Sequence, residues 1–551
     1  MADPSLSDAY AVGRRYEDAL DDDARRRGAH YTPPDVAEML VDRALRAWGE
    51  GDLPVVCDPS CGGGVFLVAA AEALRRRGAS PEAILDRLVV GNDVDPDAAE
   101  AARAALRTWA SGHGDARARR RGAVEPRVLV GDALDASFGR RVGRVDVVVG
   151  NPPFQNQLGG ATARTPSQRA ALVDRFGSAA SGYVDIAALF QLACVELVAA
   201  GGVVTLIQPR SFLVARDAVA VRDELLARGR LEAVWLPGVA VFAANVDVCA
   251  TVIRRAGDPA VDPAAEVVTE VAVWTGRSAE RTAGAVSAGA LAGAPTWSPV
   301  WGLAHGVPKV EAPAGADEVS SVATTTAGFR DQYYGLLDHI RDDEPSHGAP
   351  LVTTAMVEPG RCEWGRRTVT IARRRRATPW VDLDALAASD ASVSAWVSRL
   401  RVPKVLVATQ TKVVEATPDP TGVLVPLTPV IAVVPTAGLE VHHLVAALTA
   451  PATTAWALTR YGGGGLSSGA LKLAANQVAQ VPLPVDRAAW ADGVALLTAL
   501  LAAGAPGGRD RWRAFGRTMN AAWRLDDEAL LEWWLDRLGA KVDRSPDDSI
   551  H

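Results

Sequence analysis

The sequence predicts an α/β fold, in which a mostly parallel sheet with helices on both faces is followed by a β-rich region and a helical tail. Short apolar runs alternate with helical segments between residues 54 and 255, and this alternation is typical of parallel strands joined by crossover helices. Short apolar segments separated by turns follow up to residue 485, and residues 486–551 return to helical spacing. We therefore expect three parts, 1–300, 301–485 and 486–551.

The first 50 residues are predicted to form helices interrupted by a turn at residues 25–34. Thr32 or the pair Pro34-Asp35 would cap the second of these helices, which continues through Leu45. From residue 54 onward, the strands are expected at 54–57, 88–93, 128–132, 145–150, 203–207, 231–236 and 246–253. Helices are expected between them, at 65–74, from residue 96, at 186–198 and at 218–227.

Composition limits the class of protein. The chain has 551 residues, of which 48% are apolar and 22% charged, so it can bury a sizeable core. There are 58 Lys and Arg residues against 65 Asp and Glu residues, a net charge of −7. This excludes an overall cationic coat for nucleic acid, although a local basic groove remains compatible with it.

Cysteine usage and hydropathy suggest a cytoplasmic protein. The five cysteines are scattered, which predicts no disulfide framework, and Cys57 and Cys61 have no second pair that would complete a zinc site. The first residues are polar and acidic, and no uninterrupted apolar run reaches about 18 residues. We therefore expect no metal, no signal peptide and no membrane span.

Polar motifs follow the first three predicted strands. The first strand ends in Asp58 and leads into a loop, 58–66, with three consecutive glycines. Glycines allow backbone amides to approach a ligand closely, but this spacing is neither GxGxxG nor a Walker A loop. Asp93 ends the second strand and suits the hydroxyls of a ribose, with Asp95 as a helix cap. Asp132 ends the third strand, where it could accept a hydrogen bond from an adenine amino group or simply occupy a turn.

The fourth strand ends in Asn151-Pro152-Pro153-Phe154. The two prolines remove backbone donors and stiffen the chain, so the carbonyls of Asn151 and Pro152 become fixed acceptors. The Asn151 side chain adds another acceptor, and Phe154 supplies a flat apolar face. This arrangement suits a planar group that carries an amino substituent, such as a nucleobase.

Together these motifs resemble the S-adenosylmethionine-dependent amino-methyltransferases of DNA. The residues that carry the resemblance are Asp-Pro-Ser-Cys-Gly-Gly-Gly at 58–64, Asn-Pro-Pro-Phe at 151–154 and the upstream Tyr-Thr-Pro at 31–33. Their order is that of the gamma-type N6-adenine enzymes, in which a target-recognition domain follows the catalytic domain. Segments at 364–365, 403–405, 461–463 and 480–484 are similar to the recognition domain of Eco57I/TaqI-like restriction-modification methylases. The resemblance implies a Rossmann-like methyltransferase sheet of seven strands.

The resemblance also implies a cofactor site and a target-base site. The residues expected to bind S-adenosylmethionine are Tyr31, Thr32, Pro33, Asp58, Pro59, Cys61, Gly62, Gly64, Asp93, Asp132 and Ala133. The residues expected to hold a flipped adenine are Asn151, Pro152, Pro153 and Phe154. Ala133 stands where the family often has a large apolar residue, so the contact to the adenine ring of the cofactor could pass to Leu134.

Further contacts are expected with the target base and with DNA. Phe242 fits best as a second stacking aromatic, and Phe212 is its competitor. The run Arg373, Arg374, Arg375 and Arg376 is a candidate for phosphate contacts, although such a run can also be a solvated face. The transfer itself needs no covalent cysteine and no metal, because the sulfonium is already activated.

The predicted function is therefore site-specific N6-adenine methylation of double-stranded DNA in a bacterial cell. A restriction-modification or phage-defence setting, with a separate restriction or defence subunit as partner, is expected. Alternatives are methylation of N4-cytosine, of RNA or of a protein glutamine. An alternative of a different class is a non-catalytic DNA-binding specificity or defence protein that kept the cofactor fold.

Overall fold

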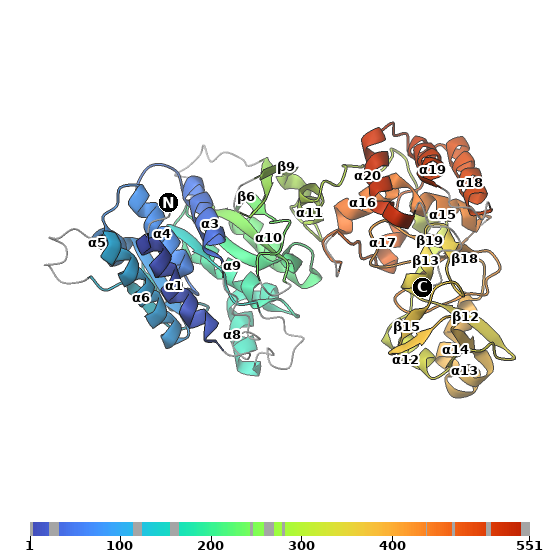
Figure 1. The fold of residues 1–551 in the computed structure, drawn as a ribbon, viewed down its shortest axis with the longest axis horizontal. Helices are drawn as coiled ribbons and strands as arrows, with labels where there is room; N and C mark the ends of the chain where they lie inside the picture. The colour runs from blue at the N-terminus through green and yellow to red at the C-terminus, as the bar shows by residue number, and fades with distance from the viewer. Residues whose placement is uncertain are drawn as a thin grey trace. The chain divides into compact units, whose positions relative to one another are not determined.

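The computed structural model divides the chain into two compact units, residues 1–305 and 306–551 (Figure 1). It describes residues 4–20, 32–113, 124–154, 165–242, 246–257, 269–277, 281–436, 438–465, 469–502 and 508–541. The two units are treated separately below.

The first unit is built on one nine-stranded sheet with the strand order β3-β2-β1-β4-β5-β7-β6-β8-β9. Strands β3, β2, β1, β4 and β5 run parallel, and β7 is antiparallel to both of its neighbours. The strands are β1 (Val56–Asp58), β2 (Val89–Asp93), β3 (Arg127–Val130), β4 (Val147–Gly150), β5 (Val203–Pro209), β6 (Gly229–Trp235), β7 (Val248–Arg255), β8 (Glu270–Thr275) and β9 (Arg281–Ser287).

The predicted count of seven strands is wrong, because β8 and β9 extend the sheet beyond β6. β8 pairs parallel with β6, and β9 pairs antiparallel with β8. The residues around them are rich in Ala, Gly, Ser and Pro, and this composition hid the alternation of buried Val271 and Val273 in β8. Strand pairing and burial of alternate side chains outweighed the weak strand preference of the small residues.

Helices cover the sheet in two groups. One group is α1 (Pro4–Asp18), α3 (Pro34–Trp48), α4 (Val65–Arg76) and α6 (Pro96–His113), in which α1 packs on α6 and α3 on α4. The other is α9 (Ile186–Leu197) and α10 (Val219–Arg228), which pack on each other and on β5 and β6 respectively. The remaining short helices are α5 (Pro81–Ala83), α7 (Phe138–Val142), α8 (Pro166–Phe176) and α11 (Ser298–Ala304).

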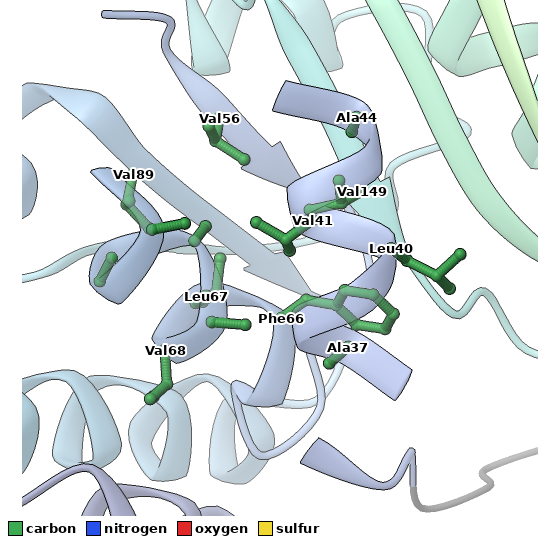
Figure 2. Close-up of a cluster of buried hydrophobic side chains, with 14 of the residues drawn as sticks. Ala37, Leu40, Val41, Ala44, Val56, Phe66, Leu67, Val68, Val89 and Val149 are labelled. Carbon is green, nitrogen blue, oxygen red and sulfur yellow. The ribbon is translucent and has the colours of Figure 1, made fainter. Parts of the chain in front are cut away.

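The core of this unit shows why α3 is a helix. Its buried residues recur every three or four positions, and Figure 2 shows Ala37, Leu40, Val41 and Ala44 along one stripe. This stripe meets the apolar side chains of α4 and of the central strands, drawn in Figure 2 as Phe66, Leu67, Val68, Val56 and Val149. Burial of these groups fixes the strands whose ends carry the polar motifs.

The second unit combines small, mostly antiparallel sheets with helices; only β12 and β20 pair parallel among the described strands of this unit. One four-stranded sheet has the order β10-β21-β18-β19 and another β11-β17-β12-β20, and β13-β14 and β15-β16 form separate hairpins. The strands are β10 (Ala323–Ala327), β11 (Ile340–Arg341), β12 (Gly348–Val352), β13 (Val357–Glu358), β14 (Arg361–Cys362), β15 (Val369–Ile371), β16 (Arg374–Arg376), β17 (Trp380–Asp382), β18 (Lys404–Val407), β19 (Ala416–Asp419), β20 (Val425–Pro426) and β21 (Ile431–Pro435).

Helices occupy the rest of the second unit. Those among the strands are α12 (Arg330–Leu337), α13 (Leu383–Ser389), α14 (Ala391–Leu400), α15 (Val441–Thr449), α16 (Pro451–Tyr461) and α17 (Ala475–Ala479). The chain then continues as α18 (Arg487–Ala502), α19 (Gly508–Ala522) and α20 (Glu528–Leu538). Trp512 of α19 and Trp534 of α20 are buried against each other, with ring centroids 6.0 Å apart. The C-terminal helices thus pack through their large aromatic side chains.

A buried ion pair joins β18 to β19 in the second unit. Lys404 Nζ lies 2.5 Å from Asp419 Oδ2, and the two side chains are 0% and 2% exposed. Burial lowers the pKa of Lys404, which Asp419 partly restores. Asp419 also accepts from the backbone N–H groups of Val423 and Leu424. Each charge therefore depends on the other for its compensation.

We predict that Asp419→Ala lowers the free energy of unfolding of the second unit by about 3–5 kcal/mol, because it leaves the Lys404 charge buried and unpaired. Urea denaturation followed by tryptophan fluorescence measures this change. The matched control is Glu311→Ala, which removes the exposed pair between Lys309 and Glu311 and should cost less than about 1 kcal/mol. Equal losses in the two variants would contradict the prediction.

Candidate functional site

The ends of four parallel strands bring the predicted site residues to one edge of the sheet. β1 lies between β2 and β4, with Cys57 paired to Val90 on one side and to Val148 on the other. Because these strands are parallel, the loops that follow them emerge at the same edge. Asp58, Asp93 and Asn151 are thereby gathered at the ends of β1, β2 and β4, and Asp132 follows β3.

The glycine loop after β1 is held by the end of β2. The Cys61 N–H donates to the Asn92 carbonyl at 2.8 Å, and the Gly62 N–H donates to Asp93 Oδ2 at 2.9 Å. Gly62 and Gly64 have φ angles of 50° and 88°, a region that favours glycine. A Cβ on Gly64 would also lie 3.0 Å from Ala102 Cα. The loop therefore needs glycine both for its backbone conformation and for its packing against α6.

Three carboxyl groups lie beside this loop, that of Asp58 buried and those of Asp93 and Glu17 half-buried. Burial, followed by the nearby Asp93 and Glu17, raises the pKa of Asp58 to about 8. Burial also raises the pKa of Asp93, and it raises the pKa of Glu17 to about 7. Within the described residues, no Lys or Arg forms an ion pair with any of the three. Such a set of acids suits a ligand that carries positive charge.

The loops after β1, β2 and β3 are linked through Asn92. Its Nδ2 donates to the carbonyl oxygens of Pro59 at 3.0 Å and Gly131 at 2.9 Å. Asp132 accepts from the Leu134 N–H at 2.8 Å, so it also caps its own turn. The predicted residues Pro59, Asp93 and Asp132 are therefore held in one connected network.

The Asn-Pro-Pro-Phe segment contacts two other predicted elements. Asn151 Nδ2 donates to Thr32 Oγ1 at 3.1 Å, and Thr32 is buried. A Cβ on Gly150 would lie 2.6 Å from Asp58 Oδ1, so glycine is needed for the approach of β1 to the start of this segment. Thr32 and Asp58 thus lie directly beside the motif, although they are far from it in sequence. Tyr31 lies outside the described residues.

Phe242 and Phe212 have different environments. The Phe154 and Phe242 rings lie 6.4 Å apart, edge to face. Phe212 instead packs against Trp297 at 5.8 Å, and its carbonyl accepts from buried Arg222. The structure therefore brings Phe242, and not Phe212, to the predicted target-base residue.

A cavity of about 190 Å³ adjoins the predicted cofactor residues Pro59 and Ala133. Phe138, Phe190 and Cys194 contribute apolar walls. Sequence reasoning missed Phe190, because α9 is buried on all sides and no periodicity singles out one of its residues. Val94 was missed as well, although it directly follows Asp93 and is 72% exposed.

Two further residues were missed on α1. Glu17 Oε1 accepts from the Gly63 N–H at 3.3 Å, and the Tyr16 hydroxyl donates to Asp95 Oδ2 at 2.7 Å. Both residues are ordinary members of an amphipathic helix in the sequence, which gives no signal of these contacts.

The arginine run lies in the second unit, on the β15–β16 hairpin. Arg373, Arg374 and Arg375 are exposed, whereas Arg376 is 8% exposed in its side chain and pairs with Asp342 at 2.7 Å. The structure thus separates Arg376, which anchors the hairpin, from the three arginines near its tip.

The described residues carry neither a metal-ligand cluster nor a membrane-spanning helix. They contain no group of three or more His, Cys, Asp or Glu side chains arranged to hold a metal ion. None of their helices is both long and apolar enough to cross a membrane. Burial raises the pKa of Cys61 well above its usual value, so this cysteine is a neutral thiol.

Comparison with known proteins addresses the family of the first unit. A family model described as N-6 DNA Methylase matches residues 7–267. The type II methyltransferase M.MamI of Microbacterium ammoniaphilum is 30% identical over 165 residues, which cover 28% of this chain and 41% of that protein. The aligned region therefore spans less than half of that relative.

A solved structure shares the fold over nearly the whole chain. It is that of the type IIL restriction-modification enzyme MmeI in complex with DNA, with a TM-score of 0.59 and 13% identity. The match covers 96% of this chain and 81% of the other. The stretch that the family model matches includes the glycine loop, Asp93, Asp132 and the Asn-Pro-Pro-Phe segment. The resemblance predicted from these motifs is therefore confirmed. The first unit thus carries a match to the N-6 DNA methylase family over residues 7–267.

Proposed function

We propose that this chain transfers a methyl group from S-adenosylmethionine to the N6 amino group of an adenine in double-stranded DNA. The observation that carries the proposal is the placement of Asn151-Pro152-Pro153-Phe154 beside the glycine loop in a unit of the N-6 DNA methylase family. The chain would act in a restriction-modification or phage-defence setting in the cytoplasm, with a separate restriction or defence subunit as partner. The shared fold with a restriction-modification enzyme supports this setting.

The residues around the glycine loop fit the proposed cofactor. S-adenosylmethionine carries an ammonium and a sulfonium, and the buried Asp58 and the half-buried Asp93 and Glu17 have no paired Lys or Arg among the described residues. Asp93 accepts one hydrogen bond on each oxygen, and a carboxylate has capacity for further donors such as ribose hydroxyls. The cofactor would supply an activated methyl group.

The adenine of the cofactor would lie at the cavity beside Pro59 and Ala133. The apolar wall formed by Phe138 and Phe190 suits a planar ring. The small side chain of Ala133 leaves this space open, and exposed Val94 offers an apolar surface next to the proposed ribose contact, Asp93. Asp132 would accept from the amino group of that adenine, beyond its own turn bond.

The target adenine would leave the duplex and stack on Phe154, with Phe242 at its edge. Its N6 lone pair is delocalised into the ring, so the nitrogen is a poor nucleophile. The Asn151 amide oxygen and the Pro152 carbonyl would accept the two amino hydrogens and draw the nitrogen toward a tetrahedral shape. Positive charge grows on N6 as the methyl transfers, so the same acceptors stabilise the transition state more than the ground state.

Contacts with the DNA backbone are proposed for the β15–β16 hairpin. Arg373, Arg374 and Arg375 are exposed around its tight turn, where Ala372 and Arg373 have positive φ angles of 49° and 65°. The pair between Arg376 and Asp342 fixes the base of the hairpin. A rigid, exposed cationic tip suits phosphate contacts.

We predict that Asn151→Ala abolishes N6-methyladenine formation and leaves the dissociation constant for S-adenosylmethionine within about threefold of wild type. The substitution removes an acceptor for the amino group but none of the residues of the glycine loop. Single-molecule sequencing of DNA from a methylation-deficient host reports the modified base and its sequence context, and calorimetry on the purified proteins reports cofactor binding. Turnover like that of wild type would contradict the proposed role of Asn151.

We predict that cofactor affinity rises between about pH 6 and pH 8. The Asp58 carboxyl, with a pKa of about 8 in the free protein, is protonated at pH 7 and must ionise to meet a cation. Binding at pH 7 should therefore release about one proton from this group, with a smaller share from Glu17. Calorimetry in buffers of different ionisation enthalpy counts these protons. Asp58→Asn should release fewer, and equal counts in both proteins would exclude Asp58 as the source.

We predict that Gln substitution of Arg373, Arg374 and Arg375 together makes DNA binding less dependent on salt. Each lost phosphate contact should reduce the slope of log K against log salt concentration by about 0.9. Fluorescence anisotropy with labelled duplexes at several salt concentrations measures the slope. The control is Arg399→Gln, which changes an exposed arginine of α14 and should leave the slope unaltered. An unchanged slope in the triple variant would assign the run to a solvated face.

A further inference from the structure

The first helix touches two of the loops that form the proposed cofactor site. Gly13, Tyr16 and Glu17 lie on one face of α1, because they are three and four residues apart. Gly13 packs directly on the glycine loop: a Cβ on Gly13 would lie 2.3 Å from the Gly63 carbonyl oxygen. A Cβ on Gly63 would in turn lie 2.5 Å from the Gly13 carbonyl oxygen. The helix backbone and the loop backbone are therefore in direct contact.

Two side chains extend this contact to different loops. Glu17 Oε1 accepts from the Gly63 N–H at 3.3 Å, in the loop after β1. The Tyr16 hydroxyl donates to Asp95 Oδ2 at 2.7 Å, in the loop after β2. Asp95 N–H in turn donates to Asp93 Oδ1, so Tyr16 is linked to the proposed ribose contact through one residue. Neighbouring residues of one helix thus hold two loops with different tasks.

We propose that α1 positions the two ends of the cofactor separately, with Glu17 acting on the amino-acid end and Tyr16 on the nucleoside end. This inference rests on the proposed function, because it names new residues for the same cofactor site. Tyr16 is a positioning residue that acts through the loop it holds, whereas Glu17 both holds its loop and would contact the cofactor itself.

The surroundings of the Glu17 carboxyl group agree with this assignment. Its Oε2 atom is buried and has no hydrogen-bond partner within the part of the chain that the structure describes. A carboxyl oxygen buried at this place would ordinarily pair with a Lys or Arg, and no described residue supplies one. The ammonium of the cofactor's amino-acid end would complete the coordination of this carboxylate, next to the glycine loop.

The same helix offers a matched control. Tyr10 also lies on α1 and is half-buried, but its hydroxyl donates to Glu38 of α3 at 2.9 Å. Tyr10→Phe removes a hydrogen bond that holds the helix without touching either loop. It reports any effect that comes only from a loosened α1.

The test compares two probes that differ only at the amino-acid end. S-adenosylhomocysteine carries the whole amino acid, and 5′-methylthioadenosine has the same nucleoside and sulfur without it. Dissociation constants for both are measured by calorimetry on the full chain, with melting temperatures as the check on folding. Glu17→Gln should raise the dissociation constant for S-adenosylhomocysteine about tenfold, the size of one hydrogen bond to a charged group, and leave that for methylthioadenosine unchanged. Tyr16→Phe should raise both dissociation constants by a similar factor, and Tyr10→Phe should raise neither.

Each other outcome is informative about one of the two proposals. Equal losses of affinity for both probes in Glu17→Gln, or no loss of affinity for either, would overturn the separate roles of Glu17 and Tyr16. A loss in Tyr10→Phe as large as that in Tyr16→Phe would reduce α1 to a structural support and overturn the inference as well. Failure of the wild-type chain to bind S-adenosylhomocysteine would instead refute the cofactor of the proposed function.

Discussion

The site depends on the parallel pairing of β1 with β2 and β4. This pairing alone brings the ends of three separate segments to one edge of the sheet, although Asp58 and Asn151 are 93 positions apart in the sequence, with Asp93 between them. Hydrophobic burial by α3 and α4 holds the strands in place, since a strand of three residues such as β1 has little stability of its own. The polar groups at the strand ends can then remain incompletely paired, because the apolar core supplies the stability that they do not.

Much of the first unit could be predicted, because its signals are local. Strand ends were marked by an abrupt change from Val-rich runs to Asp, Gly or Asn-Pro, and the helices between them by caps and apolar spacing. Contacts between distant segments could not be read in this way. Nothing in the sequence around Glu17 points to Gly63, and Thr32 lies beside Asn151 because the helix that follows it, α3, packs against β4. Strands β8 and β9 were not predicted for the same reason. Their small residues acquire a strand conformation only by pairing with β6 and with each other.

The second unit was less predictable for a related reason. Its sheets are short and assembled from segments far apart in the chain, as in the pairing of β10 with β21. The charge pattern was also ambiguous, because a row of four arginines gives no indication that Arg376 turns inward to Asp342. Likewise Lys404 lies in one of the segments that resemble recognition domains, but it forms a buried ion pair with Asp419 in the interior of the unit. In this unit, residue type predicts chemistry only after burial is known.

The hairpin of β15 and β16 divides its arginines between two kinds of evolutionary constraint. Replacement of Arg376 would leave the carboxylate of Asp342 without this partner and would release the base of the hairpin, so this position is constrained by folding. The exposed residues at the tip are not constrained in this way, and they can change without disturbing the interior. The exposed surface of the hairpin can therefore vary while the pair beneath it stays constant.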